Sequence, residues 1–318
     1  MGSMANVIEV EHLVKRFGSF TAVNDLSFTV GEGEVFGLLG SNGAGKSTAI
    51  RMLCALLTPS AGSARVLGLD VGRDAEALKR RIGYMTQRFS LYEDLTVVQN
   101  LEFFGGVYGL HGRELADRKA WALDTAGLLG KEDLLTRSLP GGWKQRLALA
   151  CSVLHRPRVV FLDEPTGGVD PLSRRRFWTL IDAMAGEGVT LIVTTHYLDE
   201  AERCDRIALM HAGRLVALGT GPELKNVFAG RTLLEVACPR FLEAQESLEG
   251  VAGVLEASVF GTRLHVVVAD LEAGRRAVQE RLEREGNVPV TIERIVPSLE
   301  DVFIHLIEAE DAAQRRTA

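Results

Sequence analysis

Cysteine is scarce in this sequence: the 318 residues include only four, and they are widely scattered. Cys54, Cys151, Cys204 and Cys238 form no C-x-x-C pair, and no cluster of histidines accompanies them. Zinc sites built from cysteine and histidine require such spacing, so the pattern gives no indication of one. We therefore expect reduced thiols, most of them buried.

Long apolar runs and an excess of positive charge are also missing. No stretch reaches the roughly 18 apolar residues that a membrane-spanning helix requires, and the N-terminus lacks the charged and then apolar pattern of a signal peptide. The net charge is −6, and residues 225–318 hold 16 acidic but only 11 basic side chains. The sequence predicts a cytoplasmic protein, and no nucleic-acid partner is expected.

The apolar pattern that is present predicts two domains, as is common for a chain of this length. From residue 4 to 224, short β-branched runs alternate with amphipathic stretches, which is typical of an α/β domain with a largely buried sheet. Apolar residues from Val97 to Tyr108 recur at helical spacing and predict a helical subdomain inserted at about 88–156. Strands are predicted at 7–10, 35–39, 159–162 and 189–194.

A second domain is predicted at 225–311, after the turn-forming pair Gly221 and Pro222. Its predicted elements follow the order β-α-β-β-α-β-α, which indicates a small α+β module of the ferredoxin-like type. The last residues, 312–318 with the sequence AAQRRTA, are expected to form a disordered tail. The predicted elements are strands at 232–237, 255–259, 264–268 and 290–295, with helices around 239–248, over 271–282 and after residue 298.

The sequence GSNGAGKST at 40–48 fits the phosphate-binding pattern G-x-x-x-x-G-K-[ST], between a predicted strand and a predicted helix. Its glycines permit a backbone nest whose amides face phosphate oxygens, and the helix adds its positive N-terminal dipole. Lys46 would reach the β- and γ-phosphates, Ser47 would bind Mg²⁺, and Thr48 would lie near the α-phosphate. The predicted binding residues are Gly40, Ser41, Asn42, Gly43, Ala44, Gly45, Lys46, Ser47 and Thr48.

Two carboxylates follow a second apolar strand in the sequence VVFLDEP at 159–165. Mg²⁺ needs oxygen ligands beside the phosphates, and Asp163 would hold the ion through water. Glu164 would face the space from which a water attacks the γ-phosphate, so we expect it to act as the general base.

Further motifs occur in the order and at the spacing of an ATP-binding cassette. They are VKRFG with Phe17, GYMTQ with Gln87, LPGGWKQRLALA from residue 139, FLDEPTGGVDP from residue 161 and VTTHYLDEAERCDRI from residue 193. The chain resembles the nucleotide-binding subunit of an ABC transporter over roughly residues 7–224. The sequences FSLYEDLTV and LPGGWKQRLAL are most similar to exporters of drugs and cell-surface molecules. The resemblance implies a P-loop NTPase cassette with an inserted helical subdomain.

The resemblance assigns roles to four further residues. Phe17 would stack on adenine, in a place where tyrosine is commoner in the family. Gln87 would reach Mg²⁺ or the attacking water. His196 would donate a hydrogen bond to the γ-phosphate and keep the base and the water aligned. Asp170 would lie at the interface between two cassettes.

The stretch LPGGW corresponds to the family sequence Leu-Ser-Gly-Gly-Gln, which binds the γ-phosphate of ATP held by the opposite cassette. Pro140 replaces the serine and has neither a hydroxyl nor an amide hydrogen to donate. Trp143 replaces the glutamine. Gly141 and Gly142 still offer amides at a helix N-terminus, so we expect a weakened but working signature.

The sequence therefore predicts an ATPase subunit that dimerises around ATP and powers a separate membrane permease, an exporter, from the cytoplasmic face of the membrane. Phe89, Leu91 and Tyr92 would contact the permease. The alternative is a soluble ABC ATPase acting on DNA or ribosomes, although the interval before LPGGW is short and lacks coiled-coil heptads. A regulatory module without turnover is disfavoured by the intact Lys46 and Glu164.

Overall fold

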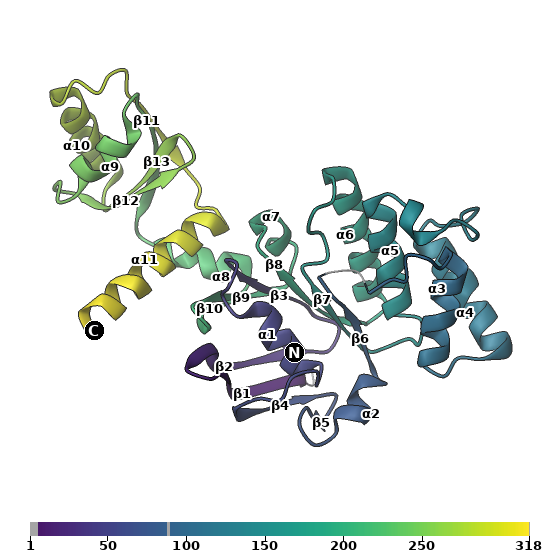
Figure 1. Cartoon of the computed structure of the whole chain (residues 1–318). Helices are drawn as coiled ribbons and strands as arrows, with labels where there is room; N and C mark the ends of the chain where they lie inside the picture. The colour runs from purple at the N-terminus through teal and green to yellow at the C-terminus, as the bar shows by residue number, and fades with distance from the viewer. Residues whose placement is uncertain (1–5, 88–89, 318) are drawn as a thin grey trace. The chain divides into compact units, whose positions relative to one another are not determined.

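The computed structural model describes residues 6–87 and 90–317, with side chains up to residue 310. The chain divides into two compact units, one that ends at Leu218 and one that begins at Gly219 (Figure 1). Helix α8, Gly221–Lys225, opens the second unit with a capping box, in which Thr220 and Glu223 accept hydrogen bonds from each other's backbone amides. The expected domain start at residue 225 falls at the end of this helix.

A six-stranded sheet in the first unit carries the strand that precedes the phosphate loop. Its strand order is β10-β9-β3-β8-β7-β6, and the parallel pairs are β9 with β3, β3 with β8, β8 with β7 and β7 with β6. Because the carboxyl ends of parallel strands share one edge, the residues that follow β3, β7 and β8 meet there. The strands are β3 Val35–Gly40, β6 Ile82–Met85, β7 Val159–Asp163, β8 Thr190–Thr195, β9 Arg206–His211 and β10 Arg214–Gly219.

A second sheet in this unit is antiparallel, has the order β2-β1-β4-β5 and shares an apolar core with the first. Phe28 of one sheet stacks on Phe36 of the other, with ring centroids 5.0 Å apart. Helix α1 adds Ile50 and Leu53 to the same core, which fixes the helix that follows the phosphate loop. These elements are β1 Asn6–Phe17, β2 Phe20–Gly31, β4 Ala61–Val66, β5 Leu69–Asp70, α1 Lys46–Leu53 and α2 Ala75–Lys79.

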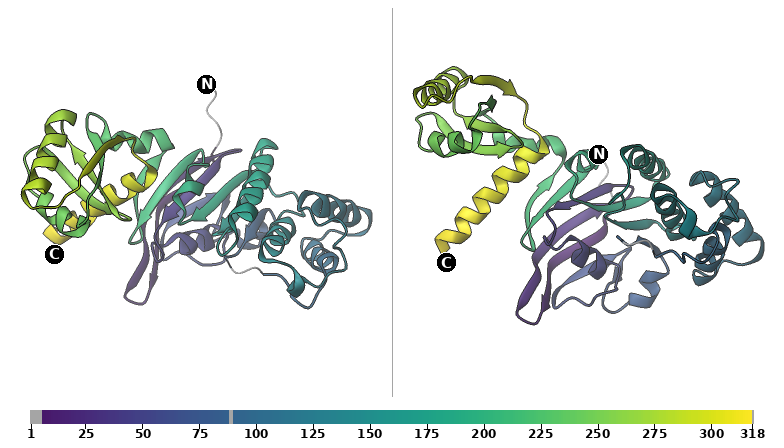
Figure 2. Two further views of the ribbon diagram at one scale, coloured as in Figure 1. Left: turned by 90° about the horizontal axis from the view of Figure 1, so that it is seen from above. Right: turned by 45° about the horizontal axis from the view of Figure 1, so that its top comes forward.

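Three helices, α3, α4 and α5, form a helical arm that stands out from the strands of the first unit (Figure 2). The arm has an apolar core of its own, which includes Val97, Leu101, Ala122 and Leu147. The interval predicted to be helical thus forms an arm with an apolar core of its own. Besides α1 and α2, the helices of the unit are α3 Val97–Val107, α4 Gly112–Thr125, the 3-10 helix Thr136–Ser138, α5 Gly141–Ser152, α6 Pro171–Gly186 and α7 Leu198–Ala201.

The second unit is built on a four-stranded antiparallel sheet of order β12-β13-β11-β14. From β11 onward its elements follow the series β-α-β-β-α-β-α, which confirms the predicted ferredoxin-like module. Leu234, Val266 and Leu282 belong to its core. The elements are β11 Thr232–Ala237, β12 Val254–Phe260, β13 Arg263–Val268, β14 Thr291–Ile295, the 3-10 helix Asn226–Phe228, α9 Phe241–Leu248, α10 Leu271–Arg284 and α11 Leu299–Thr317.

Two expectations about particular residues are settled by the fold. The four cysteines are free thiols, and Cys54, Cys151 and Cys204 are buried, as expected. The disordered tail expected at 312–318 is wrong for 312–317, because α11 continues to Thr317. Alanine, glutamine and arginine are strong helix formers, so AAQRR extends a helix that has already begun.

Candidate active site

The loop between β3 and α1 forms one wall of a cleft of about 380 Å³. Gly45 has a φ of 101°, and a Cβ placed on it would lie 2.5 Å from the carbonyl oxygen of Ala22, so this position requires glycine. The bare backbone lets the loop amides face an anion. The cleft is lined by Phe20, Ala22, Asn42, Gly43, Ala44, Gly45, Lys46, Ser47, Thr48, Gln87 and Glu164.

Lys46 is almost fully buried at this cleft. Its Nζ donates to the carbonyl oxygens of Gly40, at 2.8 Å, and Ser41, at 3.1 Å. The same nitrogen lies 3.3 Å from Glu164 Oε1. These contacts hold a positive charge between the loop and the predicted base, and the dipole of α1 adds to the positive potential. The cleft therefore suits a polyphosphate.

Asp163 ends β7, is fully buried and lies beside the phosphate loop. Its Oδ1 accepts hydrogen bonds from Ser47 Oγ and Thr194 Oγ1, each at 2.8 Å. Among the described residues its Oδ2 has no hydrogen-bond partner. Burial and the negative charge of Asp163 raise the pKa of Tyr84 to about 12. A buried carboxylate oxygen without a donor, next to a serine hydroxyl, is the kind of oxygen set that Mg²⁺ prefers, so these residues fit the ion.

The protein alone offers few ligands to a metal ion. Within residues 6–87 and 90–317, no group of three or more His, Cys, Asp or Glu side chains is arranged to hold one. An ion bound by Ser47 and Asp163 would therefore need phosphate oxygens as further ligands, as Mg²⁺ sites with nucleotides commonly do.

Glu164 directly follows Asp163 but faces the cleft. Its backbone is left-handed, with a φ of 46°. Gln87 Nε2 donates to Glu164 Oε2 at 2.9 Å, and His196 Nδ1 lies 3.5 Å from the same oxygen. The structure thus brings together the three side chains predicted to be catalytic, although they follow three different strands.

Phe17, the residue predicted to stack on adenine, does not line the cleft. It ends β1 and pairs with Phe20, the first residue of β2. Phe20 is 63% exposed and does line the cleft, whereas Phe17 is 50% exposed and lies outside the lining. In the sequence RFGSF, Phe17 and Phe20 flank one short turn. Their shared position at this turn is the signal by which the sequence could have indicated Phe20. The role of Phe17 stays a prediction, and Phe20 is the aromatic residue that sequence reasoning missed.

Gly141 and Gly142 begin α5, on a different element from the cleft. Pro140 is the capping residue, and its carbonyl accepts the amide of Trp143 at 2.9 Å. The amides of the two glycines belong to the first turn, where a helix has no internal acceptors for them. Trp143 packs against the core of the helical arm. The predicted contact of this stretch with ATP of a second cassette stays a prediction.

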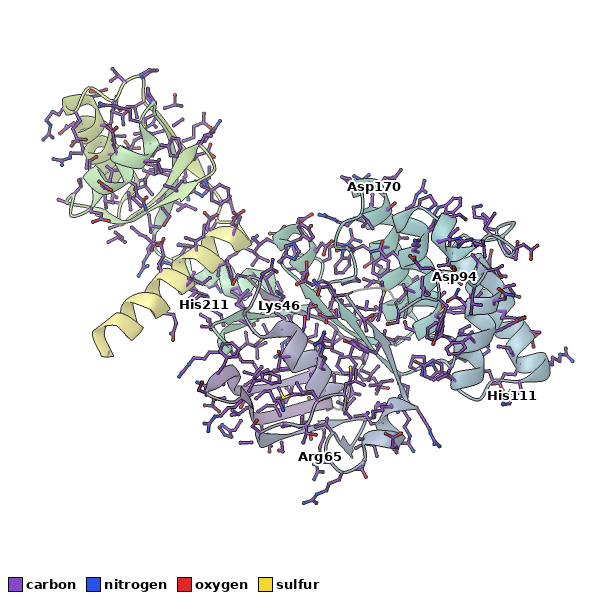
Figure 3. All side chains as sticks on the ribbon, in the orientation of Figure 1. Lys46, Arg65, Asp94, His111, Asp170 and His211 are labelled. Carbon is purple, nitrogen blue, oxygen red and sulfur yellow. The ribbon has the colours of Figure 1, made fainter. Side chains whose placement is uncertain are left out.

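Asp170 caps α6 through a hydrogen bond from the Ser173 amide to its Oδ1, at 2.9 Å. Hydrogen bonds from Ser173 lower the pKa of the Asp170 carboxyl. Figure 3 labels Asp170 at the start of α6 and Lys46 at the start of α1, on separate elements of the first unit. The carboxylate is exposed, and its predicted place at an interface between cassettes stays a prediction.

Comparison with known proteins decides the family. The profile described as "ABC transporter" matches residues 23–167, and the profile described as "ATP-binding protein DrrA1-3-like, C-terminal domain" matches residues 219–307. A profile for "AAA domain, putative AbiEii toxin, Type IV TA system" matches residues 138–198. The daunorubicin/doxorubicin resistance ATP-binding protein DrrA of Streptomyces peucetius is 39% identical over 304 residues, covering 94% of this chain and 92% of DrrA. The chain belongs to the ABC transporter ATP-binding family.

Other relatives of this cassette protein carry names connected with transport. The probable multidrug ABC transporter ATP-binding protein YbhF of Escherichia coli is 53% identical over 219 residues, which are 69% of this chain. The chain spans 38% of the length of YbhF. The Nod factor export ATP-binding protein I of Sinorhizobium fredii is 36% identical over 304 residues, 95% of this chain and 86% of that protein.

Solved structures show the same cassette fold and confirm the predicted fold class. The ATP-binding subunit of an ABC transporter superposes with a TM-score of 0.64 at 30% identity, over 70% of this chain and 93% of that chain. A dimeric post-hydrolysis state of the cassette MJ0796, bound to ADP and Pi, gives a TM-score of 0.62 at 25% identity, over 67% and 98%. This chain therefore has the fold of an ATP-binding cassette. No helix in its described part is both long and apolar enough to cross a membrane.

Proposed function

We propose that this chain is the ATP-hydrolysing subunit of an exporter. Two cassettes would join around ATP, and hydrolysis would power a separate permease from the cytoplasmic face of the membrane. The observation that carries the proposal is the convergence of Lys46, Gln87 and His196 on Glu164 at the phosphate cleft. The relatives' names, which include multidrug transport, daunorubicin resistance and Nod factor export, support export as the direction.

Hydrolysis in this geometry requires that the phosphates be held and that a water be activated. The loop amides and Lys46 would bind the β- and γ-phosphates and offset the charge that develops in the transition state. Glu164 would take a proton from the attacking water, and His196 would hold the γ-phosphate in line with it. Mg²⁺ held by Ser47 and Asp163 would supply charge stabilisation to the phosphate oxygens when bound.

A second cassette would complete each site. The amides of Gly141 and Gly142 and the positive end of α5 would receive the γ-phosphate of ATP held by the opposite chain. Gln145, fully buried on α5, donates through Nε2 to the carbonyl oxygen of Pro165, the residue after Glu164. This bond gives α5 a direct connection to the loop that carries the base.

The permease would dock on an aromatic surface of the helical arm, formed by Tyr92 and Phe103. These rings are 48% and 42% exposed, and their centroids lie 4.6 Å apart. Asn100, fully buried, holds the backbone of Tyr92 by donating to its carbonyl oxygen, at 3.0 Å, and accepting from its amide, at 2.9 Å. Leu91, by contrast, packs against the arm core. Phe89 lies outside the described residues.

The alternative, an ATPase that acts on DNA or ribosomes, has less support. The arm helices α3 and α4 have 11 and 14 residues, which leaves no room for a long coiled coil between the phosphate loop and α5. The chain also carries more acidic than basic side chains, 42 against 36.

The proposal is tested by measuring ATP hydrolysis with different partners. Any multispan membrane protein that a neighbouring gene encodes is co-expressed with the chain, and hydrolysis is measured in vesicles. We expect the membrane protein to stimulate hydrolysis and Glu164→Gln to abolish the stimulated rate. Stimulation by added DNA or ribosomes, with none by the membrane protein, would favour the alternative.

A further inference from the structure

We propose that Thr194 is a positioning residue for ATP hydrolysis, because its hydroxyl fixes Glu164 relative to Asp163. This inference rests on the roles proposed above for the two carboxylates. Thr194 lies on β8 directly beside Asp163 in the register with β7, and its side chain is fully buried. A buried hydroxyl group needs hydrogen-bond partners, and both partners of Thr194 belong to the site.

The Thr194 hydroxyl connects the two carboxylate residues with one atom. Its oxygen accepts the backbone amide of Glu164 at 2.8 Å, and it donates to Asp163 Oδ1 at 2.8 Å. A hydroxyl has a single proton, so donation to the carboxylate fixes its rotation and turns a lone pair toward the amide. The orientation of Asp163 and the backbone position of Glu164 are therefore set together.

Glu164 needs such a restraint because its backbone is left-handed, with a φ of 46°. A residue with a Cβ rarely adopts this conformation unless surrounding contacts impose it. The turn allows the Glu164 carboxylate to accept from Gln87 while Asp163 faces Ser47. Without the threonine oxygen, the buried amide of Glu164 would lack an acceptor, and the base would shift from its place at the cleft.

The same strand supplies a matched control. Thr190 is also fully buried on β8, and its hydroxyl also accepts a backbone amide, that of Gly33 at 2.9 Å. It lies at the amino end of the strand, where β8 pairs with Val159 rather than Asp163. A threonine that only stabilises the sheet should behave like Thr190.

The experiment compares Thr194→Val, Thr194→Ser and Thr190→Val in the full chain. Valine keeps the shape and removes the hydroxyl, whereas serine keeps the hydroxyl and removes the methyl group. We expect Thr194→Val to lower kcat for ATP hydrolysis roughly 10- to 100-fold, the scale of a misplaced reacting group, without loss of ATP affinity. Thr194→Ser should restore most of the turnover, and Thr190→Val should keep it.

Amide hydrogen exchange gives a readout that does not depend on turnover. Deuterium uptake in the peptide that contains Glu164 should rise in Thr194→Val and stay native-like in Thr194→Ser and Thr190→Val. In a Glu164→Gln background, Thr194→Val should cause a much smaller further loss of turnover than in the wild-type chain, since the base that it positions is already inactive.

Three results would overturn the proposal: native turnover in Thr194→Val, equal losses in Thr194→Ser and Thr194→Val, or an equal loss in Thr190→Val. A failure of the proposed base is a separate result, because it would appear as normal turnover in Glu164→Gln whatever Thr194 does.

Discussion

Ser173 occupies the space that a side chain at Gly142 would need. A Cβ built on Gly142 would lie 2.3 Å from Ser173 Oγ and 2.6 Å from Ser173 Cβ. The first turn of α5 thus packs directly on the first turn of α6, and glycine at 142 is required within a single chain. At Gly141 the nearest neighbour of a Cβ would be Val169 Cγ1 at 3.9 Å, an ordinary contact. Of these two glycines, only Gly141 can therefore be substituted to test an interface without disturbing the packing of α5 on α6.

Gly141→Asp should prevent ATP-dependent dimerisation while each monomer still binds ATP. An acidic side chain in the first turn of a helix is normally tolerated or favourable, so folding should not suffer. Facing the γ-phosphate of an opposite chain, the same carboxylate adds repulsion. Size-exclusion chromatography of the variant in a Glu164→Gln background, with ATP and Mg²⁺, measures the dimer directly. Gly141→Asn is the neutral control of similar size, and an intact dimer in Gly141→Asp would exclude the predicted role of this stretch.

Glu164→Gln should reduce ATP hydrolysis at least about 100-fold, because general-base contributions are commonly 10²–10⁴. Glutamine keeps the shape of the side chain but cannot accept the proton. ATP binding should survive, since Lys46 and the loop amides remain in place. Rates are measured by phosphate release and binding by a fluorescent ATP analogue. Near-native turnover would show that another group activates the water, and Lys46→Ala serves as the contrasting variant that should lose ATP affinity.

Much of the fold and of the phosphate site follows from local sequence. Buried strands such as Val35–Gly40 and Thr190–Thr195 have apolar, β-branched runs that specify them, and parallel pairing then gathers the residues that follow them at one edge. This is why Lys46, Glu164 and His196 meet although they lie far apart in the chain. The order of elements in the second unit was likewise readable from periodicity.

Other features depend on tertiary contacts that no local pattern contains. The turn between β1 and β2 decides that Phe20 rather than Phe17 lines the cleft. The approach of α6 to α5 decides that Gly142 cannot carry a side chain. Thr194 looks like an ordinary strand residue until its register with Asp163 is known. The contacts of Gly142 with Ser173 and of Thr194 with Asp163 join segments tens of residues apart, so spacing and propensity do not predict them.

Tyr92→Asp should abolish stimulation by the permease while basal ATP hydrolysis is retained. The ring is half-exposed and contacts Phe103, and its backbone is held by Asn100, so a change of side chain should leave the arm folded. Leu91→Asp is the contrasting variant: Leu91 packs on the arm core, and a charge there should destabilise the arm itself. Hydrolysis with and without the membrane protein, together with urea unfolding, separates the two effects. If Tyr92→Asp instead unfolded the arm, this result would show that the Tyr92 ring belongs to the arm core and not to a docking surface.

The second unit should lose stability as the pH rises through neutrality, because of an ion pair between β13 and α11. His265 Nδ1 lies 2.5 Å from Asp301 Oδ1, and both side chains are buried. Burial opposes the charged imidazole, but the hydrogen bond and charge of Asp301, with those of Glu235, outweigh it and raise the pKa of His265. Burial by itself would raise the pKa of Asp301. The hydrogen bonds from His265 and Ser298 outweigh burial and lower the pKa of Asp301 overall.

The signs of these two shifts fix the pH window. A raised histidine pKa stabilises the fold below its unfolded value of about 6.5, and the contribution is lost as the pH rises through the folded pKa. A lowered aspartate pKa stabilises the fold above the unfolded aspartate pKa of about 3.9. That contribution to stability is lost as the pH falls through the folded pKa. The pair should therefore hold α11 most firmly between about pH 4 and 6.5, and less firmly at pH 8.

Pulse proteolysis in urea at pH 6 and pH 8 measures the change, and NMR titration gives the pKa of His265. His265→Gln and Asp301→Asn should both remove this part of the pH dependence, and a His265 pKa at or below 6.5 would contradict the account.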